Sequence, residues 1–195
     1  MLTLIGTGRS RAFRVLWLLE ELGEPYAHVP ARPRSADAMA ANPSGKIPVL
    51  MVEGEALTDS TAILTWLADR AGRFTHPTGT IARARQDGLT QRVLDEMDAA
   101  LWMAARHSFI LPPERRVAAV KDSLKWEFEA ALARMADRIA GPFLMGADMT
   151  VPDIVLTHCL SWAGMAGFPA PEGALADYAD RMRAREAFAR AAARG

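Results

Sequence analysis

Two short stretches of the chain carry groups that suit the binding of an extended, acidic peptide. The first is N-P-S-G-K-I-P-V-L at Asn42–Leu50, where an apolar strand begins directly after the Ile47-Pro48 bond. X-Pro is the one type of peptide bond for which the cis form costs little, about 0.5–1 kcal/mol. A cis bond here turns the chain sharply before Val49. The N–H and C=O of Ile47 then face outward, where an extended peptide can pair with them.

The second stretch is Thr58-Asp59-Ser60-Thr61, which opens an amphipathic run and predicts the start of a helix. The first N–H groups of a helix have no partner inside the helix, so they suit a carboxylate. A peptide-binding edge beside such a helix start describes a site for a small acidic peptide. Taken alone, Asp59 and Ser60 fit a simple helix cap equally well.

The elements that position these two stretches follow from hydrophobic spacing in the first part of the chain. Short apolar runs predict strands at Met1–Ile5, Tyr26–Val29, Val49–Val52 and Ala56–Thr58. Helical spacing predicts a helix from Arg11 to Gly23, a short helix from Ser35 and a helix over Ser60–Arg70. The first of these helices keeps Arg11, Arg14, Glu20 and Glu21 on its polar face. The predicted order is β-α-β, a crossover, then β-β-α.

After a linker at Arg73–Thr80 the pattern predicts only helices, so the expected domains are 1–75 and 82–195. One long helix contains Leu89 to Ala104. The next is expected to begin at Pro112-Pro113, because proline is tolerated in the first turn of a helix. Its apolar face includes Val117. T-V-P-D at Thr150–Asp153 predicts a capping box. Further helices are expected at Leu175–Arg183 and Glu186–Arg194.

Composition narrows the range of partners. Lys+Arg and Asp+Glu balance at 23 each, which gives no support to binding of nucleic acid or an anionic membrane. The single cysteine, Cys159, excludes an intramolecular disulfide and a cysteine-based zinc site, and no metal is expected. It lies in an apolar helix, where burial without reactivity is expected. No signal-like segment or apolar run of about 18 residues occurs, so a cytoplasmic protein is expected.

Four motifs, in this order and spacing, give the whole chain its resemblance to a known family. They are S-R-A-F-R-V-L-W-L-L-E-E-L-G at Ser10–Gly23, the Asn42–Leu50 stretch, L-T-D-S-T-A-I at Leu57–Ile63, and T-V-P-D at Thr150–Asp153. The chain resembles the cytosolic glutathione S-transferases of the serine type, as found in bacteria. The resemblance implies a thioredoxin-like α/β N-terminal domain, an all-α C-terminal domain, a homodimer, and glutathione as co-substrate in detoxification.

The resemblance also implies roles for individual residues. Ile47 would pair through its main chain with the cysteinyl unit of glutathione, and Pro48 would be the cis proline. Ser60 and its amide would take the γ-glutamyl carboxylate, with Asp59 near the amine. Lys46 would add a positive charge near the glycyl end. Ser10 falls where serine-type members keep the hydroxyl that faces the thiol, with Thr7 as its rival in a variable loop.

Each of these roles has a plain structural alternative. Ser10 is a favoured N-cap residue whatever its function.

For the second substrate, the resemblance implies a pocket formed partly by early helices of the second domain. Trp102, Arg106 and Phe109 can share one helix face there and suit an anionic or aromatic electrophile. Aromatic side chains in the core and a solvated Arg106 explain the same pattern.

Three functions therefore stay open at this point. The first is transfer of the glutathione thiolate to an electrophilic small molecule. The second is a glutathione-binding or interaction protein with little catalysis, because a fold does not guarantee an activity. The third is a glutathione-dependent peroxidase or isomerase. A thiol-disulfide exchange role is disfavoured, because the loop Thr7–Arg11 contains no cysteine.

Overall fold

The computed structural model describes residues 1–139 and 141–194, which form two compact units. One unit comprises Met1–Thr78 together with Met182–Gly195, and the other comprises Gly79–Arg181. The division after Thr78 falls inside the predicted linker. The domains expected from the sequence, 1–75 and 82–195, differ from these units chiefly in where the last segment of the chain belongs.

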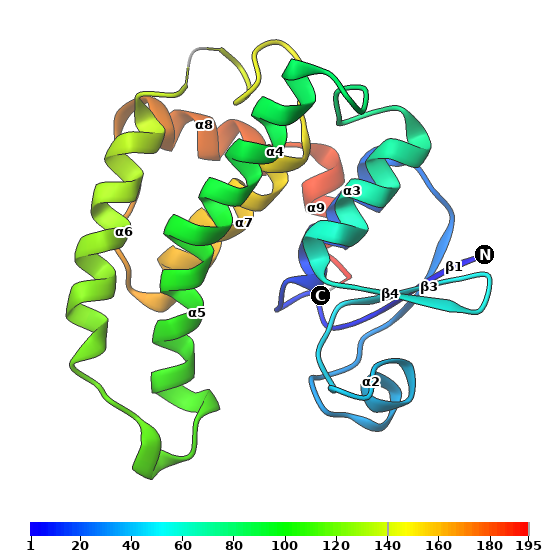
Figure 1. The fold of residues 1–195 in the computed structure, drawn as a ribbon, viewed down its shortest axis with the longest axis horizontal. Helices are drawn as coiled ribbons and strands as arrows, with labels where there is room; N and C mark the ends of the chain where they lie inside the picture. The colour runs from blue at the N-terminus through cyan, green and yellow to red at the C-terminus, as the bar shows by residue number, and fades with distance from the viewer. Residues whose placement is uncertain (140, 195) are drawn as a thin grey trace. The chain divides into compact units, whose positions relative to one another are not determined.

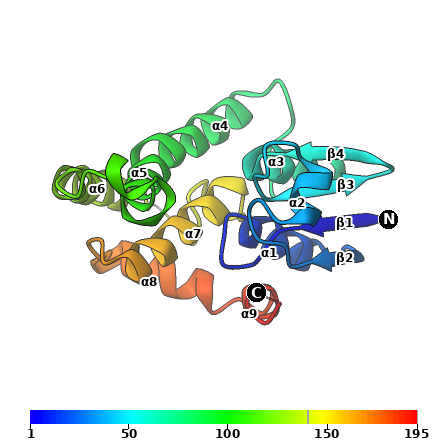
Figure 2. The ribbon, with the colours of Figure 1, turned by 90° about the horizontal axis from the view of Figure 1, so that it is seen from below.

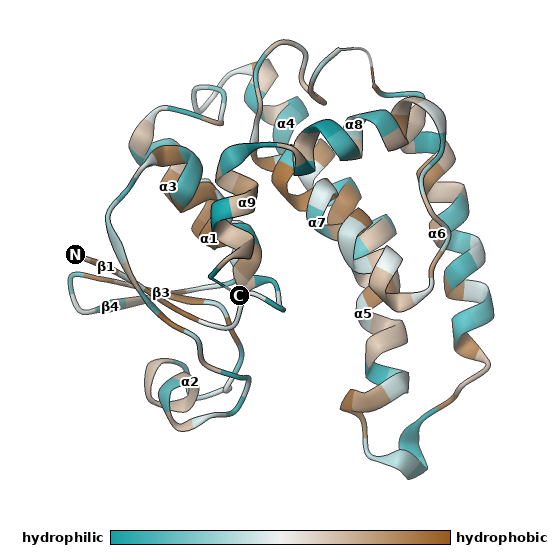
Figure 3. Cartoon of the chain, turned by 180° about the vertical axis from the view of Figure 1, so that it is seen from behind, coloured by the Kyte–Doolittle hydropathy of each residue, from teal (hydrophilic) through white to brown (hydrophobic). Residues whose placement is uncertain are grey.

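The first unit is built on a four-stranded mixed sheet (Figure 1), whose strand order β2-β1-β3-β4 can be followed in Figure 2. β1 (Leu2–Ile5) is parallel to β2 (Tyr26–Val29), and it is antiparallel to β3 (Val49–Val52), which pairs in turn with β4 (Glu55–Thr58). Helices α1 (Ala12–Leu22) and α3 (Ser60–Ala71) lie on one face, and the short α2 (Ala36–Ala41) lies on the other (Figure 3). The predicted α/β arrangement is confirmed.

Helix α1 forms the centre of this unit because its apolar residues recur at helical spacing. Val15, Leu16 and Leu19 are fully buried, and Gly23 ends the helix in the left-handed conformation at φ 70°. The C-terminal helix α9 (Glu186–Ala192) lies beside α1 (Figure 2). Its Phe188 ring meets Phe13 and Trp17 edge-on, with centroid distances of 4.9 and 5.0 Å.

The predicted polar face of α1 is wrong at one position, Arg14. This side chain is completely buried, and its Nη1 lies 3.3 Å from the hydroxyl oxygen of Ser60 at the start of α3. A buried guanidinium requires polar partners. The hydrophobic spacing alone carries no information about this partner, which comes from a distant part of the chain.

The second unit is helical. It contains α4 (Ile81–Val93), α5 (Ala99–Ala105), α6 (Val120–Ala136), α7 (Val151–Ala166) and most of α8 (Gly173–Arg183). The π-helical turn Leu94–Asp98 joins α4 and α5 into one continuous helical run, and a second such turn, Arg106–Ile110, extends it. α7 contains more buried residues than α4, α5 or α6, and Figure 3 shows hydrophobic bands along it. No helix in the described part of the chain is long and apolar enough to cross a membrane.

The predicted capping box at the start of α7 is confirmed. The Thr150 N–H donates to Asp153 Oδ2 at 2.8 Å, and Oδ1 accepts from Leu144 N–H and the Tyr178 hydroxyl. Burial raises the pKa of the Asp153 carboxyl, while these donors act in the opposite direction. The group closes the helix start and serves the fold. Cys159, nearby in α7, is buried as predicted.

The predicted helix start at Pro112-Pro113 is wrong, because α6 begins only at Val120. Pro112 is extended (φ −54°, ψ 144°) and is followed only by the 3₁₀ turn Pro113–Arg115, since a residue before proline is pushed away from the helical region. The residues that follow contact the preceding helical run instead of forming a helix. The Val117 N–H donates to His107 Nδ1 at 3.0 Å, and Val117 is 55% exposed rather than on an apolar face.

Candidate functional site

The corner at Ile47-Pro48 has the geometry that the sequence suggested. The bond is cis, and β3 begins directly after it at Val49, which pairs with Ile5 and Thr58. Within the described residues the N–H and C=O of Ile47 form no hydrogen bond. The preceding residue, Lys46, is held by the side chain of Asn42, whose Nδ2 donates to the Lys46 carbonyl oxygen at 3.1 Å. The corner therefore presents an open donor and acceptor.

Gly6, a residue that the sequence-based prediction missed, brings a second loop against this corner. It has φ 149°, a conformation that favours glycine. A Cβ at this position would lie 2.8 Å from Ala12 Cβ and 3.5 Å from Pro48 Cα. The loop that follows Gly6 contains Thr7 and Ser10, and the close approach brings the start of this loop, at Thr7, next to the cis-proline corner. An isolated glycine after a strand was the available signal.

Asp59, the residue that caps the start of α3, has a strained backbone conformation. Its φ of 70° is unusual for a residue other than glycine, and such strain costs about 1–3 kcal/mol and clusters at functional sites. Asp59 Oδ1 accepts from the N–H groups of Thr61 and Ala62 at 2.8 and 3.1 Å. The predicted cap is therefore present.

Ser60 keeps hydrogen-bonding capacity at this helix start. Its hydroxyl oxygen accepts from Arg14 Nη1. In the described part of the chain, its N–H and its hydroxyl proton meet no acceptor. The helix dipole and the buried Arg14 guanidinium both place positive potential here. An anionic group that reaches Ser60 thus finds two donors and a favourable field.

The two hydroxyl groups of the loop before α1 differ in their hydrogen bonds. Ser10 Oγ donates to the Thr7 carbonyl at 2.7 Å and accepts from the Ala12 N–H at 3.1 Å. Thr7 Oγ1 accepts a long bond of 3.4 Å from the Arg9 N–H, and its proton meets no acceptor within residues 1–139 and 141–194. Ser10 caps the first turn in this geometry, and Thr7 has the uncommitted proton.

The three residues expected to line a second-substrate pocket all lie in the helical unit. Trp102 is in α5, and Arg106 and Phe109 are in the π-helical turn that follows. Phe109 is 66% exposed and lines a cavity bounded by α5, α6 and the end of α7. Neither Trp102 nor Arg106 lines that cavity, so the structure does not bring the three together around it.

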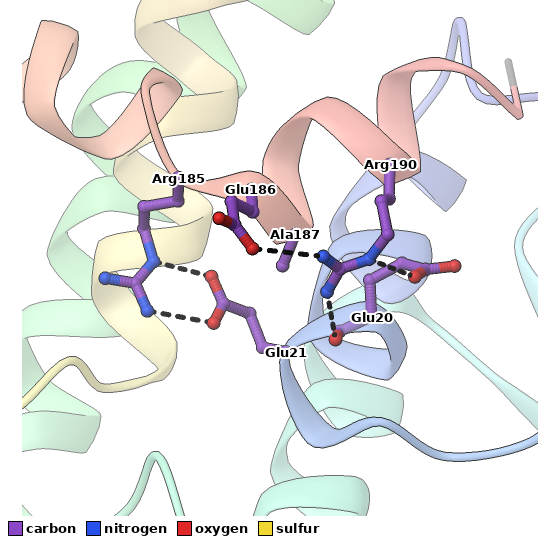
Figure 4. Close-up of a pocket in the computed structure, with 6 residues that line it drawn as sticks. All are labelled: Glu20, Glu21, Arg185, Glu186, Ala187 and Arg190. Carbon is purple, nitrogen blue, oxygen red and sulfur yellow. Dashed lines mark hydrogen bonds and ion pairs between the residues drawn. The ribbon is translucent and has the colours of Figure 1, made fainter.

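A separate hollow of about 330 Å³ lies between α1 and α9, lined by acidic and basic residues (Figure 4). Glu21 receives two bonds from the Arg185 guanidinium, and Glu20 receives one from Arg190 at 3.0 Å. Burial raises the pKa of the Glu20 carboxyl, but hydrogen bonds from Tyr26 and Arg190, with the charges of Arg194 and Arg190, outweigh it and hold the pKa below its ordinary value. These charges neutralise one another and fasten α9 to α1.

A family model and a curated relative both place the chain in the same family. The family model described as glutathione S-transferase, N-terminal domain, matches residues 9–70. A maleylacetoacetate isomerase from Rhizobium meliloti (strain 1021) is 31% identical over 157 residues, which covers 75% of this chain and 74% of that protein.

Solved structures agree in fold along nearly the whole chain. A glutathione transferase from Methylococcus capsulatus str. Bath has a TM-score of 0.84 at 24% identity, covering 98% of this chain and 97% of the other. A sphingomonad glutathione S-transferase complexed with glutathione has a TM-score of 0.82 at 25% identity, covering 97% and 96%. The predicted fold class therefore agrees with both the elements observed here and these neighbours.

Proposed function

Because the chain belongs to the glutathione S-transferase family of enzymes, we propose that it binds glutathione and adds the thiolate to an electrophilic small molecule. The observation that supports this most is the pairing of the open Ile47 main chain at a cis-proline corner with the unfilled donors of Ser60. The Ile47 main chain suits an extended cysteinyl unit, and the Ser60 donors suit a carboxylate. The solved sphingomonad relative is complexed with glutathione.

We assign the parts of glutathione to residues on this basis. The cysteinyl N–H and C=O pair with Ile47, whose orientation is fixed by the cis bond to Pro48. The γ-glutamyl carboxylate takes the Ser60 N–H and hydroxyl. The γ-glutamyl amine lies at Asp59, which has its second carboxylate oxygen to offer because the cap uses only Oδ1. The exposed Lys46 lies near the glycyl carboxylate.

The thiol is activated by lowering its pKa. A free thiol has a pKa of about 8.5, and the thiolate is the nucleophile. A shift of about two units requires roughly 2.7 kcal/mol. A hydrogen bond to a charged group supplies about 1.5–3 kcal/mol, and a helix N-terminus adds about 0.3–1 kcal/mol. Ser10 at the start of α1 supplies both once its proton turns from the Thr7 carbonyl to the sulfur.

Thr7 is the competing donor for the thiolate. Its hydroxyl proton is uncommitted in the described part of the chain, so it needs no rearrangement. Turnover of Ser10→Ala and Thr7→Val with a general aromatic electrophile separates the two. Loss of one charge-assisted hydrogen bond lowers turnover by about tenfold to a hundredfold, and glutathione affinity stays nearly unchanged. The residue whose variant behaves this way is the thiolate donor.

A second candidate is isomerisation by the same bound thiolate. The relative at 31% identity is a maleylacetoacetate isomerase. In this reaction the thiolate adds to a conjugated double bond, the resulting single bond rotates, and the thiolate leaves again, so no glutathione is consumed. We also propose that Trp102, Arg106 and Phe109 contact the second substrate, with Phe109 reaching it from the cavity between α5, α6 and α7 and the other two from outside that cavity. A cation and aromatic rings suit an anionic or aromatic electrophile.

The remaining assignments follow the family. We propose a homodimer acting in the cytoplasm, with glutathione as co-substrate and no metal. The test of the proposed binding site is calorimetric binding of glutathione to the wild type and to Ser60→Ala. Loss of the Ser60 hydroxyl weakens binding about tenfold. Equal affinity of the two proteins would remove the assigned carboxylate site.

A further inference from the structure

His28 of β2 is hydrogen-bonded to the loop that holds the two candidate thiolate donors. It lies opposite Leu4 of β1, on an edge strand of the sheet (Figure 2), and its side chain is half-buried. Its Nε2 lies 2.8 Å from the Gly6 carbonyl oxygen. A carbonyl oxygen can only accept, so Nε2 carries the proton and donates. The neutral Nε2–H tautomer and the protonated ring both provide this donor.

The bond replaces one that the sheet does not supply. Gly6 follows the last residue of β1, and its N–H donates to Val29 O at 2.9 Å, as in a parallel ladder. The same ladder would bring the Ala31 N–H to the Gly6 carbonyl. That N–H turns back around Pro30 and donates to Val29 O at 2.8 Å instead. Within the described residues, His28 is therefore the one donor to the Gly6 carbonyl.

This contact helps to fix one peptide plane. The Gly6 carbonyl and the Thr7 N–H belong to the same planar unit. The Thr7 N–H donates to Ala31 O at 2.9 Å, so both polar groups of this unit are held by the segment that starts at His28. Rotation of the plane would move Thr7 and its carbonyl, which accepts from Ser10 Oγ at 2.7 Å. The His28 contact thus acts on both hydroxyl residues of the loop.

Glycine makes the orientation of this plane depend on hydrogen bonds. Gly6 has no Cβ and has φ 149°, so sterics restrict its ψ angle less than that of any other residue. This ψ angle sets the direction of the peptide plane that follows. Without His28, the bond from the Thr7 N–H alone would hold the plane.

We propose that His28 is a positioning residue for the thiolate donor, because its Nε2–H holds the Gly6–Thr7 peptide plane and keeps Thr7 and Ser10 directed toward the bound thiol. The inference rests on the proposed glutathione chemistry and assigns a part in it to a residue outside the four sequence motifs. The proposed contacts of glutathione with Ile47 and Ser60 do not involve His28. Loss of the His28 donor should therefore raise the pKa of the bound thiol and leave glutathione affinity nearly unchanged.

The test compares two unbranched side chains of similar length at position 28. His28→Gln keeps an N–H that can reach the Gly6 carbonyl, and His28→Met has none. In His28→Met the bound thiol should ionise about half a unit to one unit higher in pH than in the wild type. Turnover with a general aromatic electrophile at about pH 6.5 should fall about threefold to tenfold, as loss of one neutral hydrogen bond predicts. His28→Gln should match the wild type in both measurements.

The pH profile separates a positioning role from general damage to the fold. At about pH 9 the bound thiol is ionised in both proteins, so the turnover of His28→Met should return to that of the wild type. A damaged site would stay slow at every pH. The KM for glutathione should change less than about twofold in either variant, because the proposed Ile47 and Ser60 contacts remain.

Tyr26→Phe is the control on the same strand. It removes the hydrogen bond of 2.7 Å from the Tyr26 hydroxyl to Glu20 and should leave the ionisation of the bound thiol unchanged. Circular dichroism checks that each variant is folded. His28→Thr, which is too short to reach the Gly6 carbonyl and is favoured in strands, replaces His28→Met if that protein does not fold.

Three results would overturn the inference and leave the proposed function intact, because in each the wild type still lowers the pKa of the bound thiol. They are an unshifted thiol in the folded Met or Thr variant, a His28→Gln protein as impaired as His28→Met, and an equal shift in Tyr26→Phe. A wild type that does not bind glutathione, or binds it without lowering the thiol pKa, would overturn the proposed function together with this inference.

Discussion

Arg14 of α1 and Ser60 of α3 are both buried, and they meet with Arg14 Nη1 3.3 Å from Ser60 Oγ. The contact joins two helices on one face of the sheet and places a full positive charge beneath the start of α3. In the proposed site this start receives the γ-glutamyl carboxylate. The contact therefore links the packing of α1 to the affinity for an anion.

The first prediction concerns that charge. Arg14→Met keeps most of the length and apolar volume of the side chain, and apolar replacement of a buried charge is often tolerated. Glutathione affinity should fall by about tenfold to a hundredfold, because one charge-assisted interaction is worth about 1.5–3 kcal/mol. Isothermal titration calorimetry measures the glutathione affinity of each protein. Arg85→Met, at an exposed position of α4, is the control and should bind normally. A folded Arg14→Met protein with unchanged affinity would contradict the prediction.

The second prediction concerns the close approach at Gly6. Gly6→Ala puts a Cβ 2.8 Å from Ala12 Cβ in a conformation of φ 149°, which should lower the free energy of unfolding by about 1–3 kcal/mol. It should also weaken glutathione binding, because the loop retreats from Pro48. Denaturant unfolding and calorimetry measure the two effects.

Gly54 supplies the control for Gly6. It has φ 92°, but a Cβ at this position would meet no atom within 4 Å, so Gly54→Ala should show the conformational cost without the crowding. Its glutathione affinity should equal that of the wild type. If both alanine variants lost stability and affinity equally, the crowding at Gly6 would have no special role.

The third prediction is a pH dependence from Glu20. Its folded-state pKa lies below the ordinary value of 4.5, so its ion pairs stabilise the protein above that pH, and the stabilisation disappears as the pH falls through the lower folded-state value. The difference in melting temperature between wild type and Glu20→Gln should therefore shrink between about pH 7 and about pH 3. Glu186→Gln, with a 96% exposed side chain, is the control. If the difference in melting temperature between the wild type and Glu20→Gln did not change with pH, the ion pairs of Glu20 would not stabilise the protein as predicted.

Much of the fold could be predicted because it depends on local patterns. The strands of the sheet, the glycine that ends α1 and the capping box at Thr150–Asp153 are each determined by residues within a few positions of one another. The Ile47-Pro48 corner was also accessible, because proline is the one residue that makes a cis bond cheap.

The features that could not be predicted depend on contacts between distant segments. Arg14 looks polar on its own helix, and its partner Ser60 is 46 residues away. The segment before α6 includes a hydrogen bond from the Val117 N–H to His107, ten residues earlier in the chain. Gly6 matters because Ala12, Ile47 and Pro48 converge on it. Spacing along one helix contains none of this information.

The most direct test of the central claim is ultraviolet titration of the glutathione thiolate bound to this protein, from acidic to alkaline pH. The account predicts thiolate formation about two units below the value of about 8.5 for a free thiol, with a shift back toward that value in Ser10→Ala or Thr7→Val. Bound glutathione that ionises near pH 8.5 in the wild type, or no saturable binding, would contradict it.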